Sequence, residues 1–389
     1  MSKLSVSARI FLQVLKKAKH GILEIQFPDG AIEQFGSGDG LIRVQVFNWS
    51  VFDLLFRKGD LGLAEAIIEG DIRVDNVAAL VEWACLNDRA LGSSIHGKWY
   101  GVLAQRLRHF FSKNTETGAK KNIQQHYDLG NEFYRLWLDP SMTYSSGIFE
   151  DKTSLAEAQN KKYDRIIDLL EIKSGDEVLE VGCGWGGFFS RAVERTGCRI
   201  TAVLNSPEQA RYNRSLIEKS GYKSNVVLQE LDYRKIQGRF DKIVSIEMIE
   251  AVGEQYWDQY FGKLGASLKH KGKTMIQGIT IREDLFYSYR RGTDFIQQYV
   301  FPGGMLLTNS VFATKGKENQ LALSDQYEFP QSYAHTLKLW RENFHASIGE
   351  VKKMGFDDKF IRLWDLYLAY CEGAFRAQRI SVGQFLLER

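Results

Sequence analysis

The chain has 389 residues, 44% of them hydrophobic and 25% charged, which is typical of a globular protein with two or three domains. A net charge of +3 excludes a strongly basic protein that binds nucleic acid through its overall charge. The four cysteines form no Cys-x-x-Cys pair, so we expect neither a disulfide framework nor a metal site. No apolar run reaches about 18 residues, so we expect no membrane span, and the amphipathic start without a cleavage site predicts a cytoplasmic protein.

The first part of the chain predicts a small α+β domain. Residues 21–35 alternate polar and apolar side chains around Pro28-Asp29-Gly30, which predicts two strands joined by a turn. Residues 41–47 alternate in the same way and predict a third strand. Residues 51–88 predict helices that are interrupted by a glycine-rich segment. We assign these elements to an N-terminal domain over residues 1–112.

The segment 97–121 changes character. Its aromatic and leucine side chains fall on one helical face, and Arg106, Arg108 and Lys113 lie among or beside them. This composition fits an interfacial helix that binds anionic lipid, and it fits slightly better a helix that packs on the following domain. A polar run then predicts a linker, so we place the boundary near residue 112 and a second domain over residues 113–389.

From about residue 175 onward, predicted strands alternate with predicted helices, which favours an α/β fold with a parallel sheet covered on both faces. The predicted strands are 177–181, 199–204, 225–231, 241–247 and 273–281. The predicted helices are 187–196, 207–219, 254–269, 334–354 and 357–377.

The stretch EVLEVGCGWGGFF, residues 177–189, joins the first of these strands to a helix through Gly182, Gly184 and Gly186. Glycines permit a tight turn and let a ligand approach the backbone. Glu180 precedes the glycines, whereas a dinucleotide fold typically has its acid about 20 residues later. We therefore favour S-adenosylmethionine over NAD as the ligand, and a turn used only for packing is the alternative.

Four further stretches follow one another in a specific order: HYDLGNEFYRLWLDPSMTYSSGIF (126–149), FDKIVSIEMIEAVGEQYW (240–257), YRRGTDFIQQYVFPGGML (289–306) and YLAYCEGAFRAQRISVGQF (367–385). With the glycine turn they resemble the cyclopropane-fatty-acid synthase family, which includes the mycolic acid cyclopropane synthases. The resemblance implies a Rossmann-like class I S-adenosylmethionine methyltransferase sheet. It also implies methyl transfer from S-adenosylmethionine to the double bond of an unsaturated acyl chain in a membrane phospholipid.

The resemblance implies a cofactor site, taken residue by residue. Tyr144 and Ser145 would lie at the methionine end of the cofactor, and Ser206 and Gln209 near its ribose. The adenosyl group would lie along the turn formed by Gly182, Gly184 and Gly186, beside Glu180. For the reacting centre the resemblance implies Glu250, with Tyr333 and Cys371 around a bicarbonate ion that serves as base. Two positions depart from some members of the family, because Gln277 replaces a histidine and Ser146 replaces a cysteine. We include both in the predicted catalytic site, and both bear on the product.

The chemistry is consistent with this interpretation. An alkene attacks a sulfonium methyl group only when the two are held close and in line, and the resulting carbocation must be kept from water. A placed base then decides the product. Proton loss from the new methyl group closes a cyclopropane ring, and loss from a neighbouring position gives a methylene group or a shifted double bond. A methylene- or methyl-branched fatty acid made with the same cofactor is therefore one alternative, and a non-catalytic lipid-binding protein is another.

The expected partner is a phospholipid bilayer that carries unsaturated acyl chains, with the enzyme bound peripherally to the inner face of the membrane. The N-terminal domain is expected either to dock on lipid or to form a homodimer. No aromatic-plus-basic module typical of nucleic-acid binding is present in the sequence.

Overall fold

The computed structural model describes residues 5–92 and 129–389, and the chain divides into two compact units. The first unit is formed by Met1–Phe111, Ser288–Val300 and Phe344–Arg379. The second is formed by Ser112–Tyr287, Phe301–Asn343 and Ile380–Arg389. The boundary predicted near residue 112 and the amphipathic segment 97–121 lie outside the described residues and stay predictions. Two segments from the second half of the chain complete the first unit.

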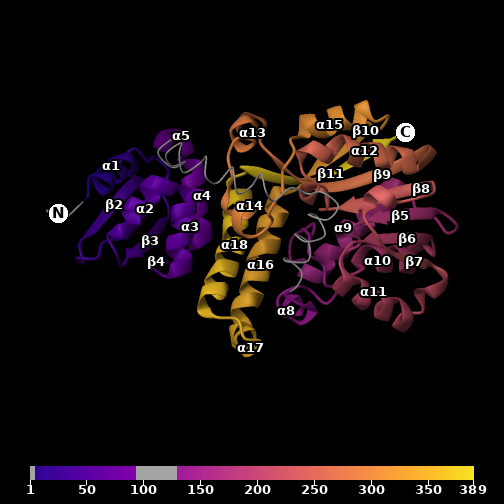
Figure 1. The fold of residues 1–389 in the computed structure, drawn as a ribbon, viewed down its shortest axis with the longest axis horizontal. Helices are drawn as coiled ribbons and strands as arrows, with labels where there is room; N and C mark the ends of the chain where they lie inside the picture. Colours follow the sequence, from indigo (N-terminus) through magenta and orange to yellow (C-terminus); the bar gives the residue numbers. More distant parts are fainter. Residues whose placement is uncertain (1–4, 93–128) are drawn as a thin grey trace. The chain divides into compact units, whose positions relative to one another are not determined.

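The first unit contains a four-stranded sheet with the order β2-β1-β3-β4 (Figure 1). Its strands are β1 Gly21–Gln26, β2 Ile32–Ser37, β3 Leu41–Val46 and β4 Ile72–Val74. The predicted hairpin is confirmed, since β1 and β2 pair antiparallel; β3 pairs parallel with β1 and antiparallel with β4. The predicted alternation places Leu23, Ile25 and Val44 in the core.

Helices from both parts of the sequence pack together in the first unit. They are α1 Val6–Leu15, α2 Ser50–Lys58, α3 Asp60–Glu69, α4 Val77–Leu86, α5 Asp88–Leu91, α14 Phe295–Tyr299, α17 Ile348–Lys353 and α18 Asp358–Arg376. The long helix α18 packs against α3 and α4. Gly373 permits this close packing, because a Cβ atom there would lie 2.4 Å from the carbonyl oxygen of Ala78.

The second unit contains a seven-stranded sheet with the order β10-β11-β9-β8-β5-β6-β7 (Figure 1). Its strands are β5 Glu177–Val181, β6 Arg199–Leu204, β7 Val226–Glu230, β8 Phe240–Ile246, β9 Leu268–Ile281, β10 Ala322–Glu328 and β11 Ile380–Glu388. The five strands from β5 to β9 are parallel, as predicted, whereas β11 pairs antiparallel with both β9 and β10. The parallel sheet is thus confirmed, with an antiparallel edge added to it.

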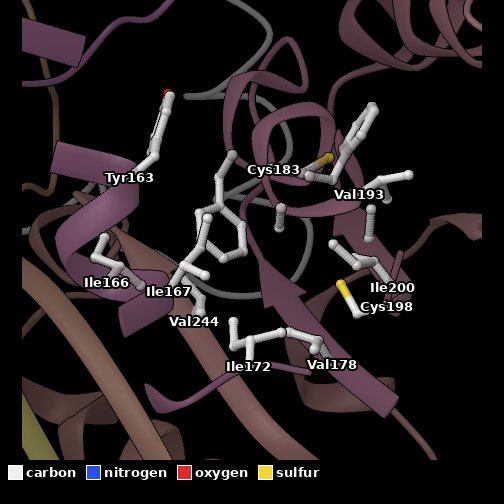
Figure 2. Packing of buried hydrophobic residues seen from close by; sticks show 14 of the residues in the cluster. Tyr163, Ile166, Ile167, Ile172, Val178, Cys183, Val193, Cys198, Ile200 and Val244 are labelled. Atoms are coloured by element: carbon white, nitrogen blue, oxygen red, sulfur yellow. The ribbon is translucent and has the colours of Figure 1, made fainter. Parts of the chain in front are cut away.

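Helices cover both faces of this sheet. They are α8 Asn131–Arg135, α9 Leu155–Leu170, α10 Gly187–Thr196, α11 Pro207–Lys219, α12 Trp257–Ser267, α13 Glu283–Tyr289, α15 Asn309–Glu318 and α16 Pro330–Ala346. Apolar side chains of α9, α10 and α11 share one core cluster with strand residues such as Val178 and Val244 (Figure 2). Successive strand residues point to opposite faces. Ser245 therefore faces the other side, where it accepts a hydrogen bond from Tyr260 of α12 at 2.8 Å.

The differences from the predicted elements have physical reasons. The edge strand β10 is mostly exposed and polar, so it lacks a hydrophobic pattern. The strand β11 is buried along most of its length, but its sequence ISVGQFLLE mixes apolar with polar residues and shows no regular alternation. The helix α9 did carry a signal that was missed, a capping box between Ser154 and Glu157 followed by apolar residues at helical spacing.

Candidate active site

The strands β5, β6 and β8 run parallel and end at the same edge of the sheet. In a parallel sheet, ligands bind outside the carboxyl ends of the strands. The residues that directly follow these strands are the glycine turn after β5, Ser206 after β6, and Glu247 to Glu250 after β8. Most of the predicted site residues therefore lie along one edge of one unit.

The turn after β5 is fixed by its backbone. The N–H groups of Gly182 and Cys183 both donate to the carbonyl oxygen of Val203 in β6, at 2.9 and 3.1 Å. Gly182, Gly184 and Gly186 have φ angles of 84°, 52° and 86°. Such left-handed angles cost roughly 1–2 kcal/mol for a residue with a side chain, which explains why glycines form the turn.

The glycines differ in what surrounds them. A Cβ atom at Gly182 would lie 2.8 Å from Cγ of Met248, and one at Gly186 would lie 2.4 Å from Cζ of Phe189. A Cβ atom at Gly184 would meet no atom within 4 Å. Asn213 fixes this position by donating from Nδ2 to the carbonyl oxygen of Gly184 at 2.8 Å. The backbone at Gly184 is therefore open to a ligand, which fits the predicted adenosyl group.

Glu180 lies beneath the turn and is only 3% exposed. The Phe189 N–H, in the first turn of α10, donates to its carboxyl group, while Oε2 has no hydrogen-bond partner among the described residues. Burial raises the pKa of Glu180 well above its usual value, and the Phe189 N–H acts against this shift. A buried, unpartnered carboxyl oxygen beside an open turn fits a ligand that carries a hydrogen-bond donor or a positive charge.

Ser206 caps the helix that follows β6. Its Oγ accepts a hydrogen bond from the N–H of Gln209 at 3.4 Å, and Pro207 is the first residue of α11. Both Ser206 and Gln209 are buried. Their predicted contact with the ribose stays a prediction.

Tyr144 belongs to a cluster of aromatic rings. Its ring centroid lies 5.5 Å from those of Tyr134 and Trp137 and 5.4 Å from that of Trp340. Trp185, from the glycine turn, lies 4.9 Å from Tyr134. The cluster therefore connects the predicted cofactor turn with the predicted reacting centre.

Ser145, next to this cluster, binds a buried lysine. Lys162 of α9 donates from Nζ to Oγ of Ser145 at 2.6 Å, and its side chain has no exposed surface. Burial lowers the pKa of Lys162 to about 7, against the attraction of Glu247 and Asp139. The ionisable amino group of Lys162 is thus buried inside the site, away from solvent.

Glu247 accepts hydrogen bonds from three different segments. Its Oε1 accepts from the backbone N–H of Ser146 at 2.9 Å and from Nε2 of Gln277 at 2.8 Å, and its Oε2 accepts from the hydroxyl of Tyr333 at 2.6 Å. Burial raises its pKa, while Lys162 and these donors act in the opposite direction. Its φ of 49° lies in the left-handed region that residues with side chains rarely adopt.

The amide of Gln277 is oriented by a chain of hydrogen bonds. Arg165 donates to Oε1 of Gln384 at 2.7 Å, and Nε2 of Gln384 donates to Oε1 of Gln277 at 3.0 Å. A guanidinium group can only donate, so it fixes the orientation of both amides. Gln277 consequently presents its NH₂ group, and not its oxygen, to Glu247.

Glu250 has a different environment. Its Oε1 accepts from the backbone N–H of Ile279 at 2.5 Å, and its Oε2 has no partner among the described residues. Burial raises the pKa of Glu250 to about 8, and the neighbouring Glu247 adds to this shift. Glu250 is therefore expected to hold a proton at neutral pH.

In the structure, Ser146, Gln277 and Tyr333 surround Glu247. Glu247 lies three positions before the predicted Glu250 in the sequence. Ser146 contributes its backbone N–H, because its hydroxyl donates to the carbonyl oxygen of Gly147 at 2.9 Å. Cys371 lies on α18 in the first unit, and burial raises the pKa of its thiol. Its predicted place beside bicarbonate therefore stays a prediction.

Two residues of this arrangement are absent from the predicted site. Glu247 was assigned no catalytic role, although an acid directly after an apolar strand, three residues before Glu250, is a visible signal. Lys162 lies in the helix α9, which was not predicted, and nothing in its local sequence marks it as buried.

Within 5–92 and 129–389, no helix is both long enough and apolar enough to span a membrane. Across the same ranges, no group of three or more His, Cys, Asp or Glu side chains is placed to hold a metal ion.

Comparison with known proteins gives consistent matches. Residues 114–385 match the family model described as mycolic acid cyclopropane synthetase. A tuberculostearic acid methyltransferase of Mycobacterium tuberculosis is 35% identical over 343 residues, which are 86% of this chain and 80% of that protein. A cyclopropane-fatty-acyl-phospholipid synthase of Escherichia coli is 30% identical over 359 residues, or 91% of this chain and 89% of that protein.

A solved structure agrees with these matches. The crystal structure of a mycolic acid cyclopropane synthase complexed with SAH and CTAB has a TM-score of 0.66 and 28% identity. It covers 69% of this chain and 98% of that chain. The predicted α/β methyltransferase fold is thereby confirmed.

Proposed function

We propose that this chain, which belongs to the mycolic acid cyclopropane synthetase family, transfers a methyl group from S-adenosylmethionine to the double bond of an unsaturated acyl chain in a membrane phospholipid. An S-adenosylmethionine-dependent enzyme of the cyclopropane synthase and methyltransferase type follows from the family itself. The phospholipid substrate, the cyclopropane product and the residue roles are the proposal.

One structural observation supports this proposed function. The open glycine turn after β5 and the two acids after β8 lie at the same edge of two adjacent parallel strands, and an aromatic cluster lies beside the turn. This arrangement supports the proposal, because it would supply a ligand site, a pair of proton-handling groups and apolar ring faces in one unit. Methyl transfer to an alkene needs all three.

The residues present fit the cofactor. Tyr144 and Ser145 would hold its methionine end, Gly184 its adenosyl group, and Ser206 its ribose, with Glu180 near the turn. When bound, S-adenosylmethionine supplies an electrophilic methyl group on a positively charged sulfur.

The chain's own residues would then exclude water, limit the negative charge at the site and accept a proton. Tyr144, Trp340 and Tyr333 pack against one another and would keep water from the reacting centre. Their ring faces would stabilise positive charge by roughly 0.5–2 kcal/mol each. Glu250, protonated at neutral pH, adds no negative charge beside Glu247. A base must finally accept a proton from the methylated chain. The resemblance gives this role to bicarbonate, whereas the geometry around Glu247 provides a carboxylate of the chain itself.

A second outcome has a specific observation in its favour. Gln277 and Ser146 replace the histidine and cysteine of some family members, and one relative is named a methyltransferase and not a cyclopropane synthase. Formation of a methylene or methyl branch with the same cofactor is therefore the alternative. Ring closure and methylene formation differ in which carbon loses its proton, whereas a saturated methyl branch requires two further hydrogens from a separate reductant.

The site of action is part of the proposal. We place the enzyme in the cytoplasm, bound peripherally to a phospholipid bilayer, with the N-terminal domain docking on lipid or forming a homodimer. The experiment is incubation of the purified chain with S-adenosylmethionine and vesicles of dioleoyl phosphatidylglycerol and dioleoyl phosphatidylethanolamine.

Mass spectrometry and proton NMR of the fatty acids give the result. A gain of one CH₂ unit with upfield cyclopropane protons is expected. The same mass gain with vinylidene protons would move the product to a methylene branch. Cofactor binding without any product on this or other unsaturated phospholipids would contradict lipid methylation and favour a non-catalytic lipid-binding protein.

A further inference from the structure

The carboxylate of Glu247 occupies the centre of the predicted base site. Tyr333 was expected beside a bound bicarbonate, and Ser146 and Gln277 were expected in the same catalytic site. Each of the three donates a hydrogen bond to Glu247. A glutamate carboxylate presents the same pair of anionic oxygens to donors as bicarbonate does. These three donors are therefore already engaged by a group of the chain.

We propose that Glu247 is the catalytic base of this enzyme and that the reaction needs no bicarbonate; this proposal rests on the proposed function. The alkene π pair forms a C–C bond to the methyl carbon, while the S–CH₃ bond breaks and its electron pair stays on sulfur. The methylated chain is then a carbocation. A C–H bond of the new methyl group breaks, its electron pair closes the ring, and the proton passes to Glu247.

The hydrogen bonds leave Glu247 able to accept that proton. Each carboxylate oxygen can accept two hydrogen bonds. Oε1 accepts two, from Ser146 and Gln277, whereas Oε2 accepts one, from Tyr333. The side chain is only partly buried, and Oε2 keeps capacity for a proton.

The backbone at Glu247 supports a functional role. A φ of 49° costs roughly 1–2 kcal/mol for a residue with a side chain. The conformation is imposed by a hydrogen bond from the Glu247 N–H to the carbonyl oxygen of Gln277 at 2.8 Å. Strained backbone of this kind is retained mainly where it positions a functional group, and here it turns the carboxylate of Glu247 back toward β9.

Neighbouring groups favour the ionised form of Glu247 and act against the effect of burial. The buried Lys162 favours the carboxylate form, and the chain from Arg165 through Gln384 makes Gln277 a donor. Burial raises the pKa of Glu247, which makes its carboxylate a stronger base than an exposed one. Glu250 holds its proton and does not compete for the role.

The first test measures lipid methylation in buffer depleted of CO₂, with and without added bicarbonate. We expect wild-type turnover to be the same in both conditions. Glu247→Gln should lower turnover by about 100-fold or more, the usual effect of losing a general base. Its affinity for S-adenosylhomocysteine, measured by calorimetry, should change by less than about threefold, roughly 0.6 kcal/mol.

The matched control is Glu177→Gln, which changes the same residue type at the exposed start of β5, paired with Lys269. It should leave turnover unchanged. Wild-type turnover that depends on bicarbonate, or Glu247→Gln turnover close to wild type, would overturn the proposal.

The second test needs no lipid turnover. Glu247→Ala leaves the Ser146 N–H, the Gln277 amide and the Tyr333 hydroxyl without their acceptor, so it should bind ¹³C-formate or ¹³C-bicarbonate, as seen by NMR. The wild type and Glu177→Gln should bind neither ion. Added formate should also restore part of the lost turnover.

A wild-type protein that binds bicarbonate, or a Glu247→Ala variant that binds no more formate than the wild type, would contradict the proposal. The binding result stands even if no phospholipid is methylated. Failure of the proposed function would instead appear as no product from the wild type with its cofactor bound.

Discussion

Two neighbouring strand ends in the second unit hold their functional groups in different ways. After β5, the chain uses its backbone: three glycines with positive φ angles form a turn whose open position is Gly184. After β8, it uses side chains: Glu247 is held by residues from a loop, from β9 and from α16. A site formed by the backbone can be recognised from a short local motif, whereas a site formed by side chains is assembled from segments that are distant in the sequence.

The largest effect is expected from Gly184→Ala, which tests whether the β5 site is a backbone site. The added methyl group would meet no protein atom within 4 Å, so it should occupy space that the cofactor needs. We expect affinity for S-adenosylmethionine to fall by about 100-fold, or roughly 2.7 kcal/mol. Isothermal titration calorimetry measures this loss.

The matched control is Gly221→Ala. Gly221 also has a positive φ, 73°, and also has no atom within 4 Å of its Cβ position, but it lies beyond α11 and outside the site. Both variants should lose similar stability, about 1 kcal/mol. Equal cofactor affinity in the two variants would show that the open position at Gly184 does not face the ligand.

Glu250→Gln tests a side chain at the β8 end. Glu250 is a buried acid, and its ionisation lowers the stability of the folded protein. The pKa of Glu250 is raised from 4.5 to about 8, so the folded state binds more protons than the unfolded state between these values. Stability of the wild type should therefore fall as pH rises through this window. Glutamine keeps the acceptor for the Ile279 N–H and removes the ionisable group.

We expect Glu250→Gln to be more stable than the wild type by about 2 kcal/mol or more near pH 8 and by much less near pH 5, as measured by urea unfolding. Turnover should decrease, since stabilising changes at such sites often impair function. A stability difference that does not change with pH would show that Glu250 titrates normally.

Glu180→Gln addresses an acidic side chain at the β5 end. Its unpartnered Oε2 is buried beneath the turn, and its raised pKa keeps it protonated at low pH. A positively charged ligand favours the ionised form, so binding should release a proton and should strengthen as pH rises.

Calorimetry in buffers of different ionisation enthalpy should detect this proton for the wild type and not for Glu180→Gln. The affinity of the variant for S-adenosylmethionine should be about tenfold lower, or about 1.4 kcal/mol. Unchanged affinity together with unchanged proton release would remove Glu180 from the cofactor site.

The contrast between the two strand ends also explains how far sequence alone could go. The strands β5 and β6, the helices α10 and α11 and the glycine turn follow from local periodicity and glycine spacing, and their bounds agree with the structure. The network at Glu247 could not be derived in this way. Gln384 lies on β11, which pairs antiparallel with β9 and brings its side chain to Gln277 across 107 residues of sequence.

Ser146→Ala is expected to have the smallest effect, and it separates backbone from side chain within the β8 site itself. The hydroxyl of Ser146 donates to the carbonyl oxygen of Gly147, while the backbone N–H donates to Glu247. Alanine keeps that N–H and removes only one neutral hydrogen bond, worth about 1 kcal/mol of stability. Turnover should fall by no more than about threefold, a barrier change of roughly 0.6 kcal/mol.

Gln277→Ala is the variant to compare with Ser146→Ala. It removes a side-chain donor and leaves Glu247 with two of its three hydrogen bonds. It should lower turnover more than Ser146→Ala does, by about tenfold. If Ser146→Ala instead loses as much activity as Gln277→Ala, the hydroxyl must leave Gly147 and reach the reacting centre when substrate is bound. The β8 end would then depend on side chains alone, and the Ser146 N–H would only set the direction of the loop.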